Sequence, residues 1–406
     1  MRLLRRLLIA LMVIAILLVA AYLILENYLA SERIAEEVAA HLEAAFGSPV
    51  EVGQADVGIV RGSRLRSLKL YESNKASHAV PWATIKEVDA DVNLWSVLKG
   101  LAIPNELLVK DAELTVRLDQ GGKLLTQLPC GRDPGATVPN IHINNGQLRL
   151  NQEGHAKFAV DHINADLHKV GDHLELEGSV DEPRWGKWTL TGRSDWPVRN
   201  GEVVLKTERP IHLTHAMLKS LPFVIPAAWE EVEAEGDAAV EIRLTFETDM
   251  ADLHYHVALE PKHTTVRVSR IDLDVEQAEG RILIDDGLVQ LRGVSGQAAG
   301  GEIHADGELD FRDEPSRLHF DLAVERLDVG KLPQWWNLPS DVEGRLTGKG
   351  ELNVTVIDGK VQVAGDGQGV IDGARKAGAP AEPIPLQLQG KDGRLRFFMP
   401  SNRRQE

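Results

Sequence analysis

Fourteen histidines are the residues of this 406-residue chain with the clearest capacity to bind a metal ion. His254 and His256 are two positions apart, so on a strand they would share one face and could coordinate the same ion. No third ligand can be placed beside them from the sequence, and His162 and His168 do not have metal-ligand spacing. Because solvated surface histidines are commoner than two-residue metal sites, we expect no metal ion.

Covalent catalysis has equally little support. The only cysteine, Cys130, lies in the segment Pro129–Pro134 without an organised base nearby, and it has no partner for an intramolecular disulfide. A turn explains Asp285 and Asp286, whereas a glycoside hydrolase needs two carboxylates that face each other across a cleft. P-loop and dinucleotide-binding fingerprints are absent from the sequence. We therefore expect no catalytic residue and no cofactor, and a membrane-anchored hydrolase is the weakest hypothesis for function.

The charge balance is acidic. Lys and Arg together number 45 and Asp and Glu 61, which gives a formal charge of −16. A nucleic-acid-binding protein needs a basic face, so nucleic acid is not an expected partner. The hydrophobic content of 43% is enough for a large core, and we expect most of the chain to be folded.

One eight-residue pattern occurs six times. Its first residue is apolar in five of the six copies, its third residue is Asp or Asn, and its fourth residue is usually Gly. Its sixth and eighth residues are apolar, and any residue occupies the other positions. Asn-Gly and Asp-Gly tolerate the positive φ angles of a type I′ turn, and alternating apolar residues share one face of a strand. The pattern therefore predicts a repeated β-hairpin with one apolar face. The six copies are Val109–Val116, Ile143–Leu150, Val198–Leu205, Ile284–Leu291, Val356–Val363 and Gly390–Phe397.

From Val50 onward, apolar residues mostly recur at every second position. Clean alternation predicts strands with one solvated and one apolar face, as in an antiparallel sheet. The frequency of turn signals predicts on the order of twenty strands. Two strands show the pattern most clearly, and their apolar residues are our candidates for a ligand-binding face: Val240, Ile242, Leu244, Phe246, Leu253, Tyr255, Val257 and Leu259.

The N-terminus carries a targeting signal. Arg2, Arg5 and Arg6 precede the uninterrupted apolar run Leu7–Leu25, which is long enough to cross a hydrocarbon core of roughly 30 Å. The positive charges favour an N-terminus that stays in the cytoplasm, with the rest of the chain exported. A cleaved signal peptide is the alternative, but its apolar region is normally shorter and ends in a small-x-small site. We favour an uncleaved single-pass anchor in residues 1–30.

A helix is predicted directly after the anchor, over residues 31–46. Ser31 is a suitable N-cap, and Ile34, Val38 and Leu42 recur at helical spacing before Gly47. Strands then follow with few helical interruptions. We divide the chain into the anchor at 1–30, a domain of helix and strands at 31–135, and a repetitive antiparallel region at 136–406.

The succession of these segments resembles the opening of AsmA-like proteins of the Gram-negative envelope, relatives of TamB and YhdP. Leu-Pro and Trp segments followed by Gly-spaced strands are similar to the C-terminal repeats of that family. The segments that carry the resemblance are Phe46–Gly53, Leu65–Leu70, Ile85–Leu94, Ala102–Leu118, Gly121–Pro129 and Val342–Val354.

The resemblance implies a single-pass inner-membrane protein with a periplasmic body. In this family an elongated antiparallel β-sheet curls into an apolar groove that is thought to conduct phospholipid between membranes and so to affect outer-membrane assembly. The expected partners are therefore the membrane and phospholipid acyl chains. The same alternation also fits two sheets packed face to face, so a non-enzymatic envelope scaffold with a closed β-sandwich core remains open. Such a scaffold would bind other envelope proteins, among them those that assemble the outer membrane.

Overall fold

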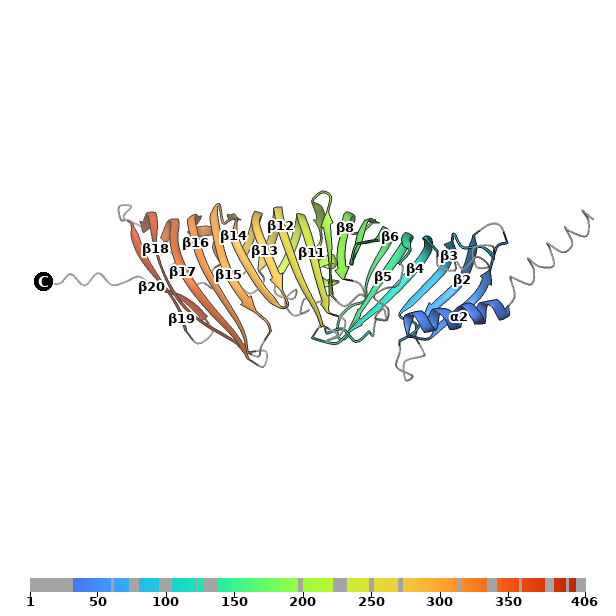
Figure 1. The fold of residues 1–406 in the computed structure, drawn as a ribbon. Coiled ribbons are helices and arrows are strands. Elements are labelled where there is room, and N and C mark those ends of the chain that lie inside the picture. Colours follow the sequence, from blue (N-terminus) through green and yellow to red (C-terminus); the bar gives the residue numbers. More distant parts are fainter. Residues whose placement is uncertain are drawn as a thin grey trace, which may run out of the picture. The chain divides into compact units, whose positions relative to one another are not determined.

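A computed structural model shows how the chain folds (Figure 1). The structure describes fifteen segments of the chain, and every structural statement below concerns these segments. They are residues 32–59, 62–72, 80–94, 104–121, 123–126, 138–195, 200–221, 232–247, 252–268, 273–312, 315–333, 342–357, 360–376, 383–391 and 394–398.

Strands make up most of the described chain, as the alternating pattern predicts. The short helical elements are α2 (Glu32–Phe46), α4 (His215–Lys219) and the 3-10 turn η3 (Val329–Lys331). The strands are β1 (Val50–Asp56), β2 (Ser63–Leu70), β3 (Ala83–Ala90), β4 (Glu106–Leu118), β5 (Asn140–Gln152), β6 (Phe158–Val170), β7 (His173–Glu182), β8 (Gly186–Asp195), β9 (Asn200–Thr207), β10 (Ile211–Leu213), β11 (Val232–Glu247), β12 (Asp252–Val268), β13 (Leu273–Asp285), β14 (Leu288–Ala298), β15 (Gly301–Asp310), β16 (Ser316–Asp328), β17 (Val342–Ile357), β18 (Lys360–Lys376), β19 (Ile384–Lys391) and β20 (Arg394–Phe398).

The strands form one large sheet that is mostly antiparallel and does not close on itself. Consecutive strands pair from β1 to β8 and again from β12 to β20. One pair breaks the antiparallel rule, because β4 and β5 run parallel, with Glu106 opposite Asn140 and Leu118 opposite Gln152. Parallel strands need a crossover connection rather than a tight turn, and the chain between residues 118 and 140 supplies its length. The prediction of a mainly β, mostly antiparallel chain is confirmed.

The chain divides into two compact units. The first holds most of the described residues up to 203 together with 245–247 and 252–253, and the second holds 204–244 and the described residues from 254 onward. In the first unit, α2 lies against the sheet (Figure 1). Leu42 packs against a buried cluster on β2, β3 and β4 that consists of Leu68, Leu70, Ala83, Val88, Val109 and Ala112. The helix therefore covers part of the apolar side of these strands.

The second unit has its own sealed cluster at one end of β16 to β19. Leu327 and Ile371 are completely buried there, and η3 contributes Val329. Asp328 caps η3, because its carboxylate accepts a hydrogen bond from the N–H of Gly330 at 3.1 Å. The remaining buried members of the cluster are Leu332, Val342, Leu346 and Leu386.

Three copies of the eight-residue pattern lie at hairpins, as predicted. Asp286 and Gly287 connect β13 to β14 with φ angles of 43° and 89°, and Asp285 pairs with Leu288. Both φ angles are positive, which is the requirement of a type I′ turn. The strands that flank the copies at 358–359 and 392–393 are likewise joined across two residues, which themselves lie outside the described residues. The prediction is wrong for the Asn-Gly pair of the third copy, because Asn200 and Gly201 are the first residues of β9 and do not form the turn; the N–H of Asn200 donates to Asp195 at 2.9 Å.

The hairpin prediction is wrong for the first two copies. Asp111 and Asn145 lie inside the continuous strands β4 and β5, where their φ angles are 50° and 58°, so neither lies at a turn. The register of β5 with β6 shifts beside Asn145, whereas the register of β4 with β3 is the same on both sides of Asp111. A positive φ interrupts the extended backbone and with it the alternation of side chains, and Val109 before Asp111 and Ala112 after it both belong to the buried cluster. The same residue pair thus ends a strand in one context and bends it in another.

The predicted helix and the predicted membrane anchor at the N-terminus have different outcomes. The predicted helix at 31–46 is confirmed as α2, and Gly47 ends it with φ 70° and an N–H that donates to the carbonyl of Glu43 at 2.8 Å. The apolar run Leu7–Leu25 and the N-cap candidate Ser31 lie outside the described residues. Among the helices that the structure describes, none has the length and apolar character needed to span a membrane.

Candidate functional site

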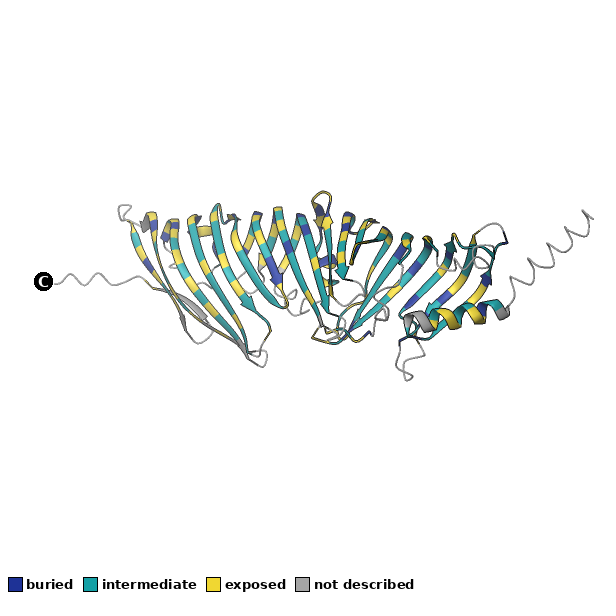
Figure 2. Ribbon diagram, viewed as in Figure 1, coloured by how far each residue is buried: buried dark blue, intermediate teal, exposed yellow. Residues whose placement is uncertain are grey.

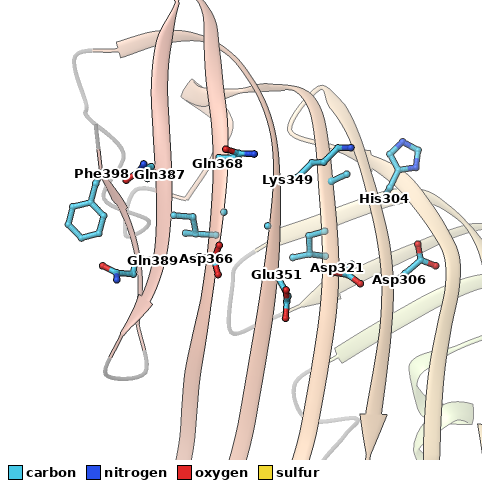
Figure 3. Close-up of a pocket in the computed structure, with 15 residues that line it drawn as sticks. His304, Asp306, Asp321, Lys349, Glu351, Asp366, Gln368, Gln387, Gln389 and Phe398 are labelled. Atoms are coloured by element: carbon cyan, nitrogen blue, oxygen red, sulfur yellow. The ribbon is translucent and has the colours of Figure 1, made fainter. Parts of the chain in front are cut away.

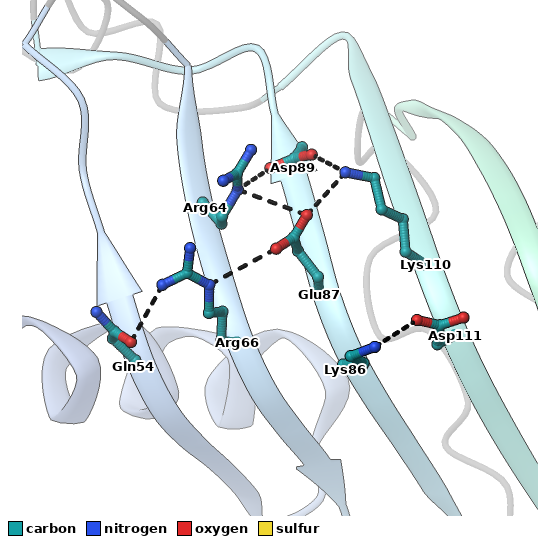
Figure 4. A network of polar contacts seen from close by, with 8 residues as sticks. All are labelled: Gln54, Arg64, Arg66, Lys86, Glu87, Asp89, Lys110 and Asp111. Carbon is teal, nitrogen blue, oxygen red and sulfur yellow. Dashed lines mark hydrogen bonds and ion pairs between the residues drawn. The ribbon is translucent and has the colours of Figure 1, made fainter.

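Opposite charges pair across the strands of the first unit (Figure 4). Lys110 on β4 lies 2.7 Å from carboxylate oxygens of both Glu87 and Asp89 on β3, and Arg64 on β2 lies 2.5 Å from Asp89. Partial burial of Asp89 raises its pKa, but the hydrogen bonds from Arg64 and Lys110 outweigh that effect, so the pKa of Asp89 is below its ordinary value. The network neutralises itself and holds adjacent strands together.

Apolar side chains on alternate positions of the second unit line up from strand to strand. Because the register of each pair is fixed, residues at the same level form rows that cross the sheet. One row is Leu259, Ile282, Leu291, Gly307, Phe320, Leu352 and Gly365. The next row is Val257, Ile284, Val289, Leu309, Leu318, Val354 and Val363.

These apolar rows are only half-buried. Among the described side chains in the two rows, Ile284 is buried, and the apolar residues beside it from Val257 to Val354 keep an intermediate exposure. Figure 2 shows intermediate residues along much of the strands in this region. Leu327 and Ile371, in the sealed cluster at the end of the same strands, have no exposed surface. Within the described segments, the rows therefore have neighbours on their own face but do not have the full cover of a closed core.

The structure places the eight candidate residues on β11 and β12. Val240 is buried, and its backbone N–H donates to the hydroxyl of Thr207 at 3.0 Å. The other seven candidates are half-buried. The ring of Phe246 lies so close to Gly201 that a Cβ there would meet its Cε1 at 2.8 Å. Val257 and Leu259 are brought together with Ile284 and Ile282 of β13.

Tyr255 is the one candidate residue that can ionise. Burial raises the pKa of its phenol to about 12, and the negative charge of Asp286 adds to the rise. Its hydroxyl therefore stays neutral across the physiological pH range. The phenol introduces no charge at this point of the strand.

The sequence interpretation missed the continuation of this face beyond β12. Ile282, Leu291, Phe320 and Leu352 extend the same row across β13 to β17, with Gly307 at the same level of β15. The alternation around Phe320 is visible in the sequence. The register that places it beside Leu352 depends on where the hairpins and bulges fall, which the pattern alone does not give.

The histidines considered as metal ligands each contact a carboxylate. Nδ1 of His254 lies 2.6 Å from a carboxylate oxygen of Asp286, and His256 forms a shorter contact with Asp285. No group of three potential His, Cys, Asp or Glu ligands converges within the part of the chain that the structure describes. Cys130 lies outside that part.

An open hollow of about 760 Å³ lies over β15 to β20 (Figure 3). Its lining is largely polar and includes carboxylates on four successive strands, those of Asp306, Asp321, Glu351 and Asp366. These residues alternate along their strands with the apolar rows. None of the eight candidate residues lines this hollow, so it is a separate feature from the predicted apolar face.

Comparison with protein-family models, with curated proteins and with solved structures gave no match. The resemblance to AsmA-like proteins therefore rests on the sequence pattern.

The geometry described above lends itself to binding by burial. An apolar face that is half-exposed can cover the hydrocarbon of a ligand without any directional contact. The charged side chains drawn in Figure 4 are already paired with one another, among them Arg64 with Asp89 and Lys110 with Glu87. The arrangement thus favours a ligand recognised through its apolar part.

Proposed function

We propose that this chain is a non-enzymatic, membrane-anchored protein of the cell envelope whose sheet forms an apolar groove for the acyl chains of phospholipid. Residues 1–30 would hold it in the inner membrane, with the body in the periplasm. The groove would conduct lipid between membranes and so affect the assembly of the outer membrane. The proposal combines the sequence resemblance with the half-buried apolar rows.

The observation that carries the proposal is the contrast in burial along single strands. On β16, Leu327 is sealed, whereas Leu318 and Phe320 at the same face remain half-exposed. Covering each methylene of an acyl chain on such a face contributes about 0.8 kcal/mol. Because the contact is not directional, a lipid could move along the rows from one strand to the next without breaking specific bonds.

The alternative function is an envelope scaffold, which would bind outer-membrane assembly proteins around a closed sandwich core. It predicts that the apolar rows are covered in the working protein by other parts of the chain or by a partner. The two proposals differ in what contacts the apolar side chains, and that contact can be measured.

The test uses the full chain in cells. A photoreactive amino acid is placed at Leu244, which is a candidate residue, and at Thr245, which is its neighbour on the opposite face of β11. Both positions are half-buried, so they form a matched pair. After irradiation, we expect phospholipid adducts at position 244 and few or none at 245, detected by mass spectrometry of the purified protein.

The charge variants Leu244→Asp and Thr245→Asp complete the test. A groove predicts that Leu244→Asp stays folded and loses co-purified phospholipid, while Thr245→Asp retains it. A closed core predicts that Leu244→Asp unfolds, because a carboxylate would be buried without a partner. Equal lipid adducts at both positions, or none at either, would rule out the groove.

A further inference from the structure

Like charges stand directly opposite one another on the polar side of β15 to β18. Asp306 pairs in register with Asp321, Asp321 with Glu351, and Glu351 with Asp366 (Figure 3). Like charges in such positions repel and weaken strand pairing. In the first unit, by contrast, opposite charges face each other: Arg64 stands opposite Asp89, and Glu87 stands opposite Lys110.

One histidine bridges the middle of this acidic row. Nδ1 of His319 on β16 lies 3.0 Å from the amide oxygen of Asn353 on β17 and 3.6 Å from Glu351 Oε1. Because an amide oxygen only accepts, Nδ1 carries a proton and donates it to Asn353. The other nitrogen, Nε2, is then the site that gains or loses a proton, and it lies 3.6 Å from a carboxylate oxygen of Asp321.

The charges around His319 are mostly negative. Glu308 on β15 stands directly opposite His319, Glu351 lies on β17, and Asp321 is two residues away on β16 itself. Arg317, two residues away in the other direction, is the permanent cation of the same strand face. The hydrogen bond with Asn353 and the charges of Asp321 and Glu351 raise the pKa of His319, against a smaller effect of burial.

We propose that His319 is a proton-operated clamp that ties β16 to β17 across the row of like charges. Protonated, it carries a positive charge between Asp321 and Glu351 and offsets their repulsion. Neutral, it keeps only the hydrogen bond to Asn353, and the repulsion between the opposed carboxylates is no longer offset. The pairing of β16 and β17 is then tight in mild acid and loosens as the pH rises.

The direction of the pH effect follows from the linkage between proton binding and folding. A histidine with a raised pKa in the folded state binds its proton more tightly there than in the unfolded chain. Its contribution to stability is therefore complete below about pH 6.5, the ordinary value, and disappears as the pH rises through the folded pKa. The side chain of His319 is 42% exposed, so solvent moderates the effect.

The test is hydrogen exchange of the full chain at pH 6.0 and 8.5, with rates corrected for the intrinsic effect of pH. Amides in 316–328 and 342–357 should lose about two- to five-fold in protection at the higher pH, the range expected from one cross-strand charge pair. Peptides that cover 63–70 and 83–90, where opposite charges already pair, serve as the internal reference and should change less.

Two substitutions separate the charge from the side chain. His319→Gln keeps a hydrogen-bonding group and cannot titrate, so it should remove most of the pH dependence and show the lower protection at both values. His319→Arg carries a permanent charge and should retain high protection at pH 8.5. The control is His142→Gln in the first unit, where His142 pairs with Asp166 at 2.5 Å, and it should leave 316–357 unchanged.

One condition needs no substitution. Adding salt to the wild-type chain at pH 8.5 screens the opposed carboxylates and should restore protection at β16 and β17. An unchanged pH dependence in His319→Gln would overturn the clamp. So would a failure of both His319→Arg and added salt to raise protection at pH 8.5.

Discussion

Asn145 donates a hydrogen bond from its side-chain amide to a carboxylate oxygen of Asp111 at 2.6 Å. The two residues occupy the same position of the first two copies of the repeated pattern, and each has a positive φ inside its strand. β4 and β5 run parallel with a constant offset, so the copies lie side by side along their length. The bond therefore joins the two strands at the level where each backbone departs from the extended conformation.

Asn145 should be sensitive to replacement for two separable reasons. Its φ of 58° costs a residue such as alanine about 1–2 kcal/mol, whereas Gly adopts it freely. Asn145→Ala loses both the backbone preference and the hydrogen bond to Asp111, while Asn145→Gly loses mainly the bond, worth about 1 kcal/mol. Chemical denaturation should rank the stabilities wild type, then Gly, then Ala. Equal stabilities for the two variants would show that the backbone conformation costs nothing here.

How far the sequence predicts this fold depends on how local the decisive interaction is. The turn at Asp286 and Gly287 and the helix α2 follow from residues within a few positions of each other, and both are foreseeable. The positive φ angles of Asp111 and Asn145 inside strands are not foreseeable, because the same Asp or Asn followed by a small residue fits a turn equally well. The neighbouring strand decides between the two, and β4 pairs with a strand that begins more than twenty residues after its own end.

Local sequence is also insufficient to predict which residues neighbour one another on the candidate apolar face. The alternation through Val257 and Leu259 identifies the apolar side of β12 from sequence. The identity of their neighbours, Ile284 and Ile282, depends on register. The opposition of Asp321 and Glu351 could not be foreseen for the same reason, since each alone is an ordinary solvent-facing residue in an alternating strand.

The ion pair of Asp310 and Arg312 predicts a loss of stability in acid. The hydrogen bond from Arg312 lowers the pKa of Asp310 to about 2, from an ordinary value of 3.8. A lowered pKa contributes stability above the ordinary value, and this contribution is lost as the pH falls from about 4 to about 2. Arg312→Gln should therefore lower the urea midpoint at pH 6 and lower it much less near pH 2.

A matched substitution controls for the loss of a guanidinium group. Arg292 donates to the neutral amide oxygen of Gln290 at 2.7 Å, and no carboxylate takes part in that bond. Arg292→Gln should shift the urea midpoint by a similar small amount at both pH values. A pH-independent effect of Arg312→Gln would contradict the assignment.

Gly287 should tolerate only residues that accept a positive φ. Its φ of 89° follows the positive φ of Asp286 in the two-residue turn between β13 and β14. Gly287→Ala should cost about 1–2 kcal/mol of unfolding free energy, and Gly287→Asn should cost less because Asn enters this region more readily. Hydrogen exchange of β13 and β14 offers a local readout. A harmless Gly287→Ala would mean that the hairpin tolerates another turn type.

A comparison of two leucines on β16 measures whether the apolar face is open. Leu327 has no exposed surface in the sealed cluster, so Leu327→Ala should cost about 2–5 kcal/mol through lost burial and the cavity left behind. Leu318 lies on the half-buried apolar row between Leu309 and Val354, and Leu318→Ala should cost about 1 kcal/mol, since less of its surface leaves water on folding. Denaturant unfolding followed by circular dichroism gives both values in the same protein.

If Leu318→Ala proves as costly as Leu327→Ala in protein stripped of lipid, another part of the molecule covers the row and the closed scaffold is favoured. If its cost rises only when lipid is present, the ligand itself is the missing cover, because whatever binds the folded face and not the unfolded chain adds its binding free energy to stability.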